Sequence, residues 1–291
     1  MKNPMPRVIC AGHVNWDVTL HVDDLPAPDG EARVREARAA GGGSAANVAC
    51  GLVGLDVDAG LVGSLGGDSN GTEARHELAA AGVDTTHLRT VPDRPTAVKY
   101  IAVDDAGEVM VFGVPGANEA YDAAGVSESA LAAADHLHLT GQSPATAARL
   151  ADRAHEAGLS VSVDPGRRVE TRDFAPVLTR AEFVFLNDRE AGCVACDVDG
   201  VVVRKRGSEG AEVVAGDDRY AHQGFAAEAV DTTGAGDAFA AGFLAACLDD
   251  ADYGEALVVA NACGALASEV RGARVDLSWP AVEVIRARGP D

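Results

Sequence analysis

Residues Val230–Leu244 place a glycine turn, a carboxylate and an apolar run next to one another. The turn reads Asp-Thr-Thr-Gly-Ala-Gly-Asp, and the apolar residues after it predict a buried helix. Small residues at a helix start leave the first N–H groups reachable, and the helix dipole favours an anion such as phosphate there. Asp237 stands in the same helix start, where it could accept the proton of a hydroxyl that attacks a phosphoryl group. The stretch therefore predicts phosphoryl transfer with Asp237 as the base. Gly234, Ala235 and Gly236 would form the turn that holds the phosphoryl group.

Two alternatives compete with this interpretation. The pattern Gly234-x-Gly236 is also that of a flexible turn before a core helix, and this alternative stays open. It is also half of a dinucleotide-binding fingerprint, but Phe239 stands where the third glycine or alanine belongs. No βαβ unit follows the pattern and no acidic residue stands at the needed offset, so we reject the dinucleotide alternative.

The same seven residues resemble the second signature of the ribokinase-like (PfkB) family of carbohydrate and nucleoside kinases, Asp-Thr-x-Gly-Ala-Gly-Asp. The resemblance implies an α/β fold, a ribokinase-like three-layer sandwich with a central, mostly parallel sheet, helices on both faces and a small β-sheet lid. Strands that alternate with helices after Ser127 independently predict a parallel sheet. The resemblance runs from Val8 to about Val282, so we expect residues 1–291 to form a single ribokinase-like domain. It also implies ATP as phosphoryl donor and Mg²⁺ as cofactor.

Polar residues follow the first predicted strand, Val8–Gly12. Asn15 and Asp17 stand where open α/β sheets bind ligands, although Asn-x-Asp alone is more typical of a turn. The later Gly-Gly-Gly-Ser-Ala-Ala-Asn matches the first signature of the family. Gln142 stands near the position at which ribokinases carry a sugar-binding glutamate. Lys99 could supply the positive charge that an acid substrate would need. The predicted substrate-binding residues are Asn15, Asp17, Gly42, Gly43, Asn47, Lys99, Gln142 and Asp237.

Two segments, 17–40 and 95–117, each contain two strand patterns around a turn and no helix to cover them. The turn Asp104-Asp105-Ala106-Gly107 is typical of a hairpin. The resemblance implies that both segments form the family's lid, which closes over the sugar and excludes water. Since the lid often carries the dimer contact, we expect a homodimer.

Asn187 and Glu190 match the Asn-x-x-Glu motif with which the family organises Mg²⁺ and the nucleotide phosphates, largely through water. Mg²⁺ keeps several waters, so two side chains would suffice. Without the resemblance, Glu190 fits an acid at a helix start equally well. The resemblance also implies a potassium site at a loop containing Asp231 and Thr233. The predicted ATP-binding residues are Asn187, Gly207, Ser208, Gly210, Gly236, Asn261 and Gly264.

The segment between Asn187 and Gly207 is shorter than the family pattern. The basic residues Lys205 and Arg206 before this glycine are candidates for facing phosphate or for a solvated charge run. Cys193-x-x-Cys196 has no second pair at zinc spacing, so we interpret it as two small core or loop residues.

The formal net charge is −21, and only Lys2, Lys99 and Lys205 are lysines. Such a chain repels nucleic acid and anionic membranes, so neither is expected as a partner. A carboxylate-rich, lysine-poor surface predicts a halophilic organism. At about 1 M salt the screening length falls to roughly 3 Å, so the self-repulsion of such a surface is largely removed. The N-terminus lacks the apolar region of a signal peptide and the longest apolar run is too short for a bilayer, so we expect a soluble, cytoplasmic protein.

The predicted reaction is transfer of the γ-phosphoryl group of ATP to a hydroxymethyl group of a small sugar, ribose-like or another pentose or ketose. A nucleoside or a ketodeoxy sugar acid is the alternative substrate, since Ser44 stands where ribokinases carry a lysine. A regulator that binds sugar or nucleotide without catalysis is the alternative from a different class. The intact Asp237, Asn187 and Glu190 argue against it.

Overall fold

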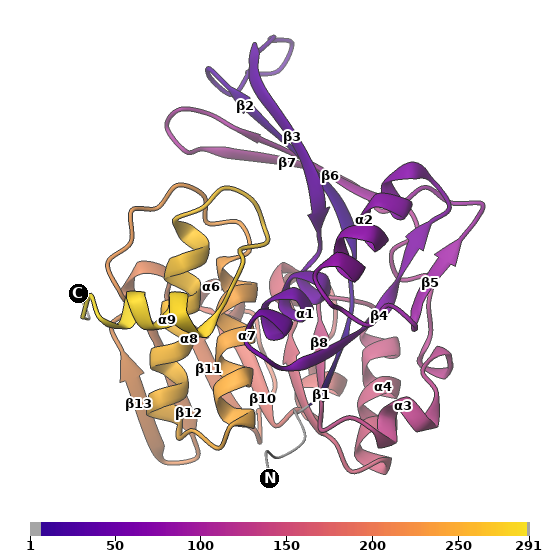
Figure 1. The fold of residues 1–291 in the computed structure, drawn as a ribbon, viewed down its shortest axis with the longest axis vertical. Coiled ribbons are helices and arrows are strands. Elements are labelled where there is room, and N and C mark those ends of the chain that lie inside the picture. Colours follow the sequence, from indigo (N-terminus) through magenta and orange to yellow (C-terminus); the bar gives the residue numbers. More distant parts are fainter. Residues whose placement is uncertain (1–6, 290–291) are drawn as a thin grey trace.

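A computed structural model describes residues 7–289 of the protein, and Figure 1 shows a layered body with a small sheet rising from it. Nine strands form the large sheet. In spatial order they are β13 (Asp218–His222), β12 (Ala211–Ala215), β11 (Val201–Lys205), β10 (Phe183–Asn187), β9 (Ser160–Asp164), β8 (His136–Thr140), β1 (Arg7–Ala11), β4 (Asp58–Gly66) and β5 (Leu88–Val91). Neighbouring strands are parallel except at β11–β12 and β12–β13. The predicted, mostly parallel sheet is therefore confirmed.

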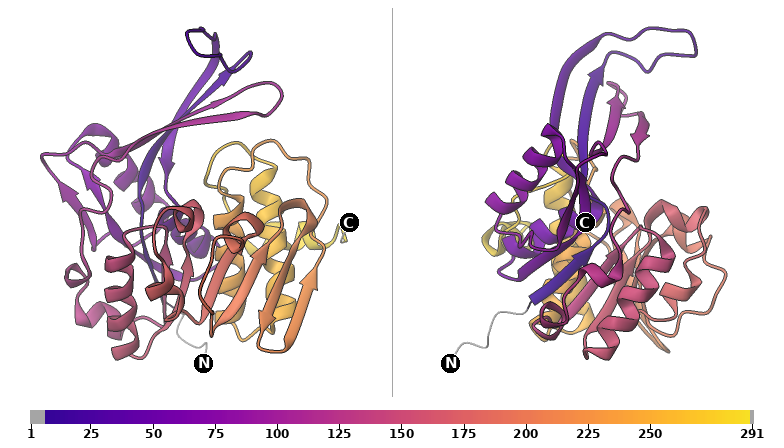
Figure 2. Two further views of the ribbon diagram at one scale, coloured as in Figure 1. Left: turned by 180° about the vertical axis from the view of Figure 1, so that it is seen from behind. Right: turned by 90° about the vertical axis from the view of Figure 1, so that its right-hand side faces the viewer.

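Helices cover both faces of this sheet, because the central strands are apolar on both sides (Figure 2). In β1, Val8 and Cys10 join one core cluster, and Ile9 and Ala11 join the other. The first cluster packs under α1 (Ser44–Gly54), α2 (Ser69–Ala80), α7 (Ala235–Leu248), α8 (Tyr253–Ser268) and α9 (Trp279–Arg286). The second packs under α3 (Glu128–Ala132), α4 (Pro144–Glu156), α5 (Ala175–Leu178) and α6 (Asp188–Ala191). Short 3₁₀ turns are η1 (Ala123–Gly125), η2 (Gly166–Glu170) and η3 (Gly207–Glu209).

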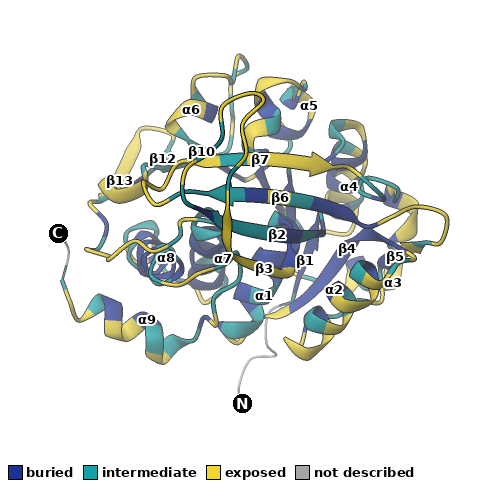
Figure 3. Ribbon diagram, turned by 90° about the horizontal axis from the view of Figure 1, so that it is seen from above, coloured by how far each residue is buried: buried dark blue, intermediate teal, exposed yellow. Residues whose placement is uncertain are grey.

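The small sheet has the order β3 (Val34–Gly42), β2 (Asn15–Val22), β6 (Ala97–Val103), β7 (Val109–Val114). Each predicted hairpin is present as an antiparallel pair, and the parallel pairing of β2 with β6 joins the two. β2 starts shortly after β1 ends, so the small sheet rises from the carboxyl edge of the large one (Figure 1). Seen from above, β7 forms its exposed outer edge (Figure 3). The root of this sheet thus lies where open α/β sheets bind ligands.

The structure differs from the sequence-based expectations at the sheet edge, where the hairpin β12–β13 was not predicted. Gly216 turns between these strands with φ 61°, a backbone conformation that glycine adopts without strain. The two histidines of β8, His136 and His138, lie in the core. Both are buried against the hydroxyls of β9, and burial lowers the pKa of His136 to about 3. Within residues 7–289, no helix is both long and apolar enough to span a membrane.

Candidate active site

The glycine turn before α7 holds the backbone in a conformation that only glycine adopts readily. Gly234 has φ 79°, and a Cβ there would lie 2.1 Å from the carbonyl oxygen of Ala273. The Ala235 N–H donates to the preceding turn, and the first bond inside the helix begins at Ala238. The N–H groups of Gly236 and Asp237 therefore have no acceptor in the described chain, and an anion can bind them.

The Asp237 carboxylate belongs to a hydrogen-bonded chain that links α7 to the first glycine signature. Its Oδ2 accepts from Nδ2 of Asn47 at 2.8 Å, and Oδ1 of Asn47 accepts from Nε of Arg274 at 3.2 Å. Another nitrogen of this guanidinium donates to the carbonyl of Gly42 at 3.2 Å. Burial raises the pKa of Asp237, an effect that the Asn47 hydrogen bond opposes. A positioned carboxylate with a raised pKa suits a general base.

The root of the small sheet holds the predicted sugar-binding residues with polar atoms to spare. Asn15 pairs with Gly42, and a Cβ on this glycine would lie 2.0 Å from Oδ2 of Asp17. Nδ2 of Asn15 and Oδ1 of Asp17 are buried and have no hydrogen-bond partner among the described residues. Burial raises the pKa of Asp17, against the positive charges of Lys99 and Arg274. Unpaired buried polar atoms are costly, so this pair is available to the hydroxyl groups of a ligand.

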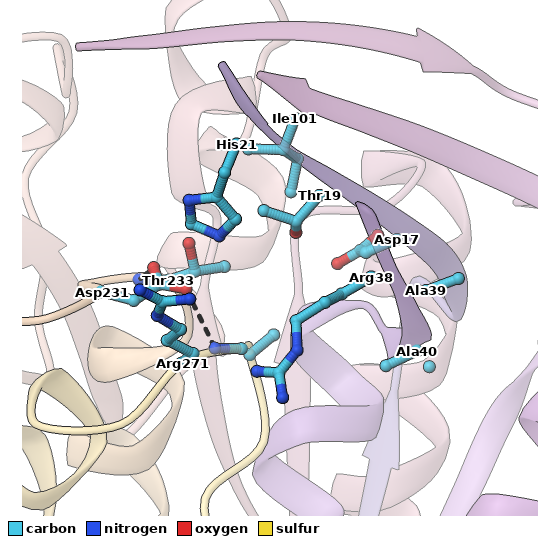
Figure 4. Close-up of a pocket in the computed structure, with 13 residues that line it drawn as sticks. Asp17, Thr19, His21, Arg38, Ala39, Ala40, Ile101, Asp231, Thr233 and Arg271 are labelled. Atoms are coloured by element: carbon cyan, nitrogen blue, oxygen red, sulfur yellow. Dashed lines mark hydrogen bonds between the residues drawn. The ribbon is translucent and has the colours of Figure 1, made fainter. Parts of the chain in front are cut away.

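A cavity of about 270 Å³ extends from Asp17 along the inner face of the small sheet (Figure 4). The loops around Asp231 and Arg271 close its other side. Both oxygens of the Asp231 carboxylate accept backbone N–H groups, from Thr233 and Gly272, each at 2.9 Å. This carboxylate therefore joins the two loops, and its contacts give no support to the potassium site predicted there.

The sequence left Lys205 open between a phosphate contact and solvent, and in the structure its ammonium lies beside the glycine turn. A Cβ on Gly236 would come 3.5 Å from Nζ, and Nζ forms a buried ion pair with Oδ2 of Asp164 at 2.5 Å. Burial acts to lower the pKa of Lys205, but the carboxylates around it, Asp164 foremost, together outweigh burial and the pKa is raised. The basic pair before Gly207 was the only sequence signal, and it did not distinguish phosphate from solvent.

Asn187 and Glu190 form a capping box at the start of α6. Oδ1 of Asn187 accepts from the Glu190 N–H at 2.9 Å, and Oε2 of Glu190 accepts from the Asn187 N–H at 3.0 Å. Burial raises the pKa of Glu190, and the charge of Asp164 adds to the rise. Between residues 7 and 289, no three His, Cys, Asp or Glu side chains gather as a metal-binding group. The helix-start alternative for Glu190 is thus present in the structure, beside the Lys205 ion pair.

The remaining predicted nucleotide residues lie at the η3 turn and in α8. Gly207 begins the η3 turn and Gly210 follows it, with φ 58° and 83°, and Ser208 lies inside it. A Cβ on Gly264 would lie 3.5 Å from the carbonyl of Ala235, so this glycine is next to the start of α7. Asn261 uses its Nδ2 within its own helix, donating to Leu257 at 2.7 Å.

Gln142 lies in the core rather than in an open site. It is fully buried, its Nε2 donates to the carbonyl of Ala11 at 3.0 Å, and its Oε1 accepts from the Tyr121 hydroxyl. Both ends of the amide are thus occupied by protein groups, and we do not include Gln142 in the substrate site below. Its sequence position placed Gln142 just after β8, at the edge of the sheet where ligands are expected. The direction of its side chain, however, depends on packing.

The sequence profile of the pfkB family of carbohydrate kinases matches residues 5–280. The chain belongs to this family. An ATP-dependent ribose-1-phosphate kinase of Halopiger xanaduensis is 52% identical over 97% of this chain and 98% of its own length. A nucleoside kinase of Methanothermobacter thermautotrophicus is 31% identical over 90% of this chain and 87% of its own length. These relatives confirm that this pfkB protein is a sugar-kinase-type phosphotransferase.

The fold of this carbohydrate kinase is shared with solved structures. Ribokinase of Arabidopsis thaliana, solved with ribose and ATP, has a TM-score of 0.85 at 24% identity, over 97% of this chain and 99% of that one. A likeness at this identity concerns the fold alone, and it confirms the predicted ribokinase-like architecture.

Proposed function

We propose that this kinase transfers the γ-phosphoryl group of ATP to the hydroxymethyl group of ribose 1-phosphate. The relative at 52% identity carries this activity in its name, and it spans nearly the whole chain. The observation that carries the proposal is the meeting of Asp237 with Asn47, 190 positions apart, beside two free N–H groups. The competing substrates are a free pentose, which the sequence predicted, a nucleoside and a ketodeoxy sugar acid.

In the proposed reaction, Asn15 and Asp17 hold hydroxyl groups of the sugar with their unpaired atoms. Asp237 accepts the proton of the hydroxymethyl group while the oxygen of that group bonds to the γ-phosphorus. The bond from this phosphorus to the bridging oxygen breaks, and ADP leaves with the electron pair. The N–H groups of Gly236 and Asp237, with the Lys205 ammonium, stabilise the charge on the transferring oxygens.

Mg²⁺ would bind at Asn187 and Glu190, largely through water. In support, only Oε2 of Glu190 accepts a protein hydrogen bond in residues 7–289, so Oε1 is available. The charge of nearby Asp164 also acts on this carboxyl group. Mg²⁺ prefers oxygen ligands, keeps several waters and needs only one or two carboxylates, so these residues fit it. When bound, the ion neutralises charge on the phosphates.

We also propose that the small sheet is a lid and that its outer face carries a homodimer contact. Tyr100 and Phe112 are cross-strand partners on this face and are 42% and 59% exposed. Val114 on the same face is 44% exposed. Sedimentation of Phe112→Glu tests the contact: we expect a monomer, and an unchanged mass would refute it.

Finally, the net charge of −21 and the relative from Halopiger xanaduensis support a cytoplasmic enzyme adapted to high salt.

The test is ADP release with Mg²⁺ and ATP at high KCl over ribose 1-phosphate, ribose, a nucleoside and a ketodeoxy sugar acid. We expect the highest kcat/KM with ribose 1-phosphate. Asp237→Asn should lose at least about a hundredfold in kcat, because acid–base assistance is typically worth 10²–10⁴. A higher kcat/KM with another sugar would reject the substrate. Near-normal turnover of the variant would reject the base, and no ADP release with any sugar would favour the regulator.

A further inference from the structure

Two cations near the sugar-binding residues form no direct ion pair in the described part of this strongly acidic protein, although the charges of Asp17 and Glu119 act on them from a distance. Most half-buried lysines and arginines of residues 7–289 form an ion pair or a hydrogen bond to a carbonyl. Lys99 and Arg168 are the exceptions, since neither side chain has an ion pair or a hydrogen bond in the described chain. A half-buried cation without a partner is unusual where the net charge is −21. These two side chains are therefore candidates for binding an anion from outside the chain.

Both cations lie near the end of β1 that leads into the small sheet. Lys99 of β6 stands in register with Asp17. Arg168 lies in η2, directly after β9, and a Cβ on Gly141 would lie 3.5 Å from its Cγ. Burial lowers the pKa of His13, and the charges of Arg168 and Lys99 lower it further. Both cations therefore act on one ring, two residues before Asn15.

The carboxylate that could neutralise Arg168 is already engaged. Oε1 of Glu119 lies 2.8 Å from Nε2 of His13 and 2.7 Å from a guanidinium nitrogen of Arg172. Glu119 also has φ 62°, an uncommon conformation for a residue with a side chain. The surrounding contacts thus hold Glu119 on His13 and Arg172, so its charge acts on Arg168 without a direct ion pair.

The other cations that line the nearby cavity are less suitable. Arg38 and Arg271 share one carboxylate, Glu36, at 3.3 and 2.9 Å. Their side chains are 56% and 46% exposed. Their charge is already matched and is screened by solvent, so they offer less to a bound anion.

We propose that Lys99 and Arg168 form the subsite for the phosphate of the acceptor sugar. This inference rests on the proposed function and names the residues that select a phosphorylated sugar over a free one. An arginine guanidinium binds phosphate with paired hydrogen bonds, and lysine adds a point charge. With its phosphate there, the sugar would lie on Asn15 and Asp17, and its hydroxymethyl group would face Asp237.

The test compares Lys99→Gln and Arg168→Gln with the control Arg167→Gln. Arg167 is the preceding residue, and it is exposed and unpartnered in the described chain. We expect the KM for ribose 1-phosphate to rise about tenfold to a hundredfold in both charge-removing variants, since bonds to charged groups are the strong ones. The kcat, the KM for ATP and the KM for ribose should change little. Arg168→Lys should recover part of the loss, and calorimetric titration with ribose 1-phosphate should give the same order of affinities.

The outcomes separate this inference from the proposed function. If the wild type uses ribose 1-phosphate but both variants keep its KM, the subsite is wrong and the function stands. If the wild type does not use ribose 1-phosphate, the function fails at the first measurement and the phosphate subsite fails with it. If the wild type prefers a ketodeoxy sugar acid and the variants lose that preference, the site binds a carboxylate and the phosphate assignment is overturned.

Discussion

Gly236→Ala should separate stability from catalysis in this kinase. Gly236 is the second residue of α7, and its φ is not positive. The nearest atom to an added Cβ is Nζ of Lys205 at 3.5 Å, an ordinary van der Waals contact. Alanine is about 1 kcal/mol more favourable than glycine in a helix interior, and somewhat less at a helix end. We therefore expect Gly236→Ala to fold normally, with a melting temperature equal to or above that of the wild type.

Catalysis should respond in the opposite direction. The new methyl group would stand beside the Lys205 ammonium, in the space that the proposed mechanism gives to the transferring phosphoryl group. Loss of one donor to a developing oxyanion typically costs 10²–10³ in kcat. We expect a loss of about this size.

Gly254→Ala is the matched control, because Gly254 is the second residue of α8, away from the site. Its added Cβ would lie 3.2 Å from Oδ1 of Asp252, which caps α8 by accepting the Glu255 N–H at 2.9 Å and would have to move by a few tenths of an ångström. Calorimetric melting and coupled ADP release give the two readouts. The control should keep its kcat, with a melting temperature close to that of the wild type, because the helix propensity of alanine offsets the crowding of the Asp252 cap. If Gly236→Ala keeps the wild-type kcat, or loses as much stability as activity, the phosphoryl group does not bind this turn.

Four further predictions concern charge. Lys205→Met should lose turnover and about 3–5 kcal/mol of unfolding free energy, because Asp164 is left buried without its partner. Adding Asp164→Asn should restore the melting temperature but not kcat, and full recovery of both would exclude Lys205 from catalysis. Burial raises the pKa of Asp237, so kcat/KM should fall with decreasing pH at a pKa above the usual carboxylate range. The raised pKa also means that the protonated form favours the folded state, so Asp237→Asn should melt no lower than the wild type at pH 7, and a lower melting point would contradict this. Finally, the melting temperature should rise between about 0.1 and 1 M KCl as the charge of −21 is screened, and a constant value would refute the halophile hypothesis.

Much of this fold could be predicted because its signals are local. The glycine turn, the helix start and Asp237 are adjacent in sequence, and backbone torsions and helix hydrogen bonds act over only a few residues. Alternating strand patterns with a good turn likewise predicted both hairpins of the small sheet. The hairpin β12–β13 was missed because its exposed edge strand, from Asp218, has few apolar residues.

The sequence alone thus determined the family, the glycine turn before α7 and the carboxylate beside it, because each depends on neighbouring residues. Only the tertiary structure decided which side chains meet. It brought Asn47 to Asp237, paired Lys205 with Asp164 and enclosed Gln142 in the core. These contacts depend on strand order, register and side-chain packing across the sheet, which no short pattern of residues specifies.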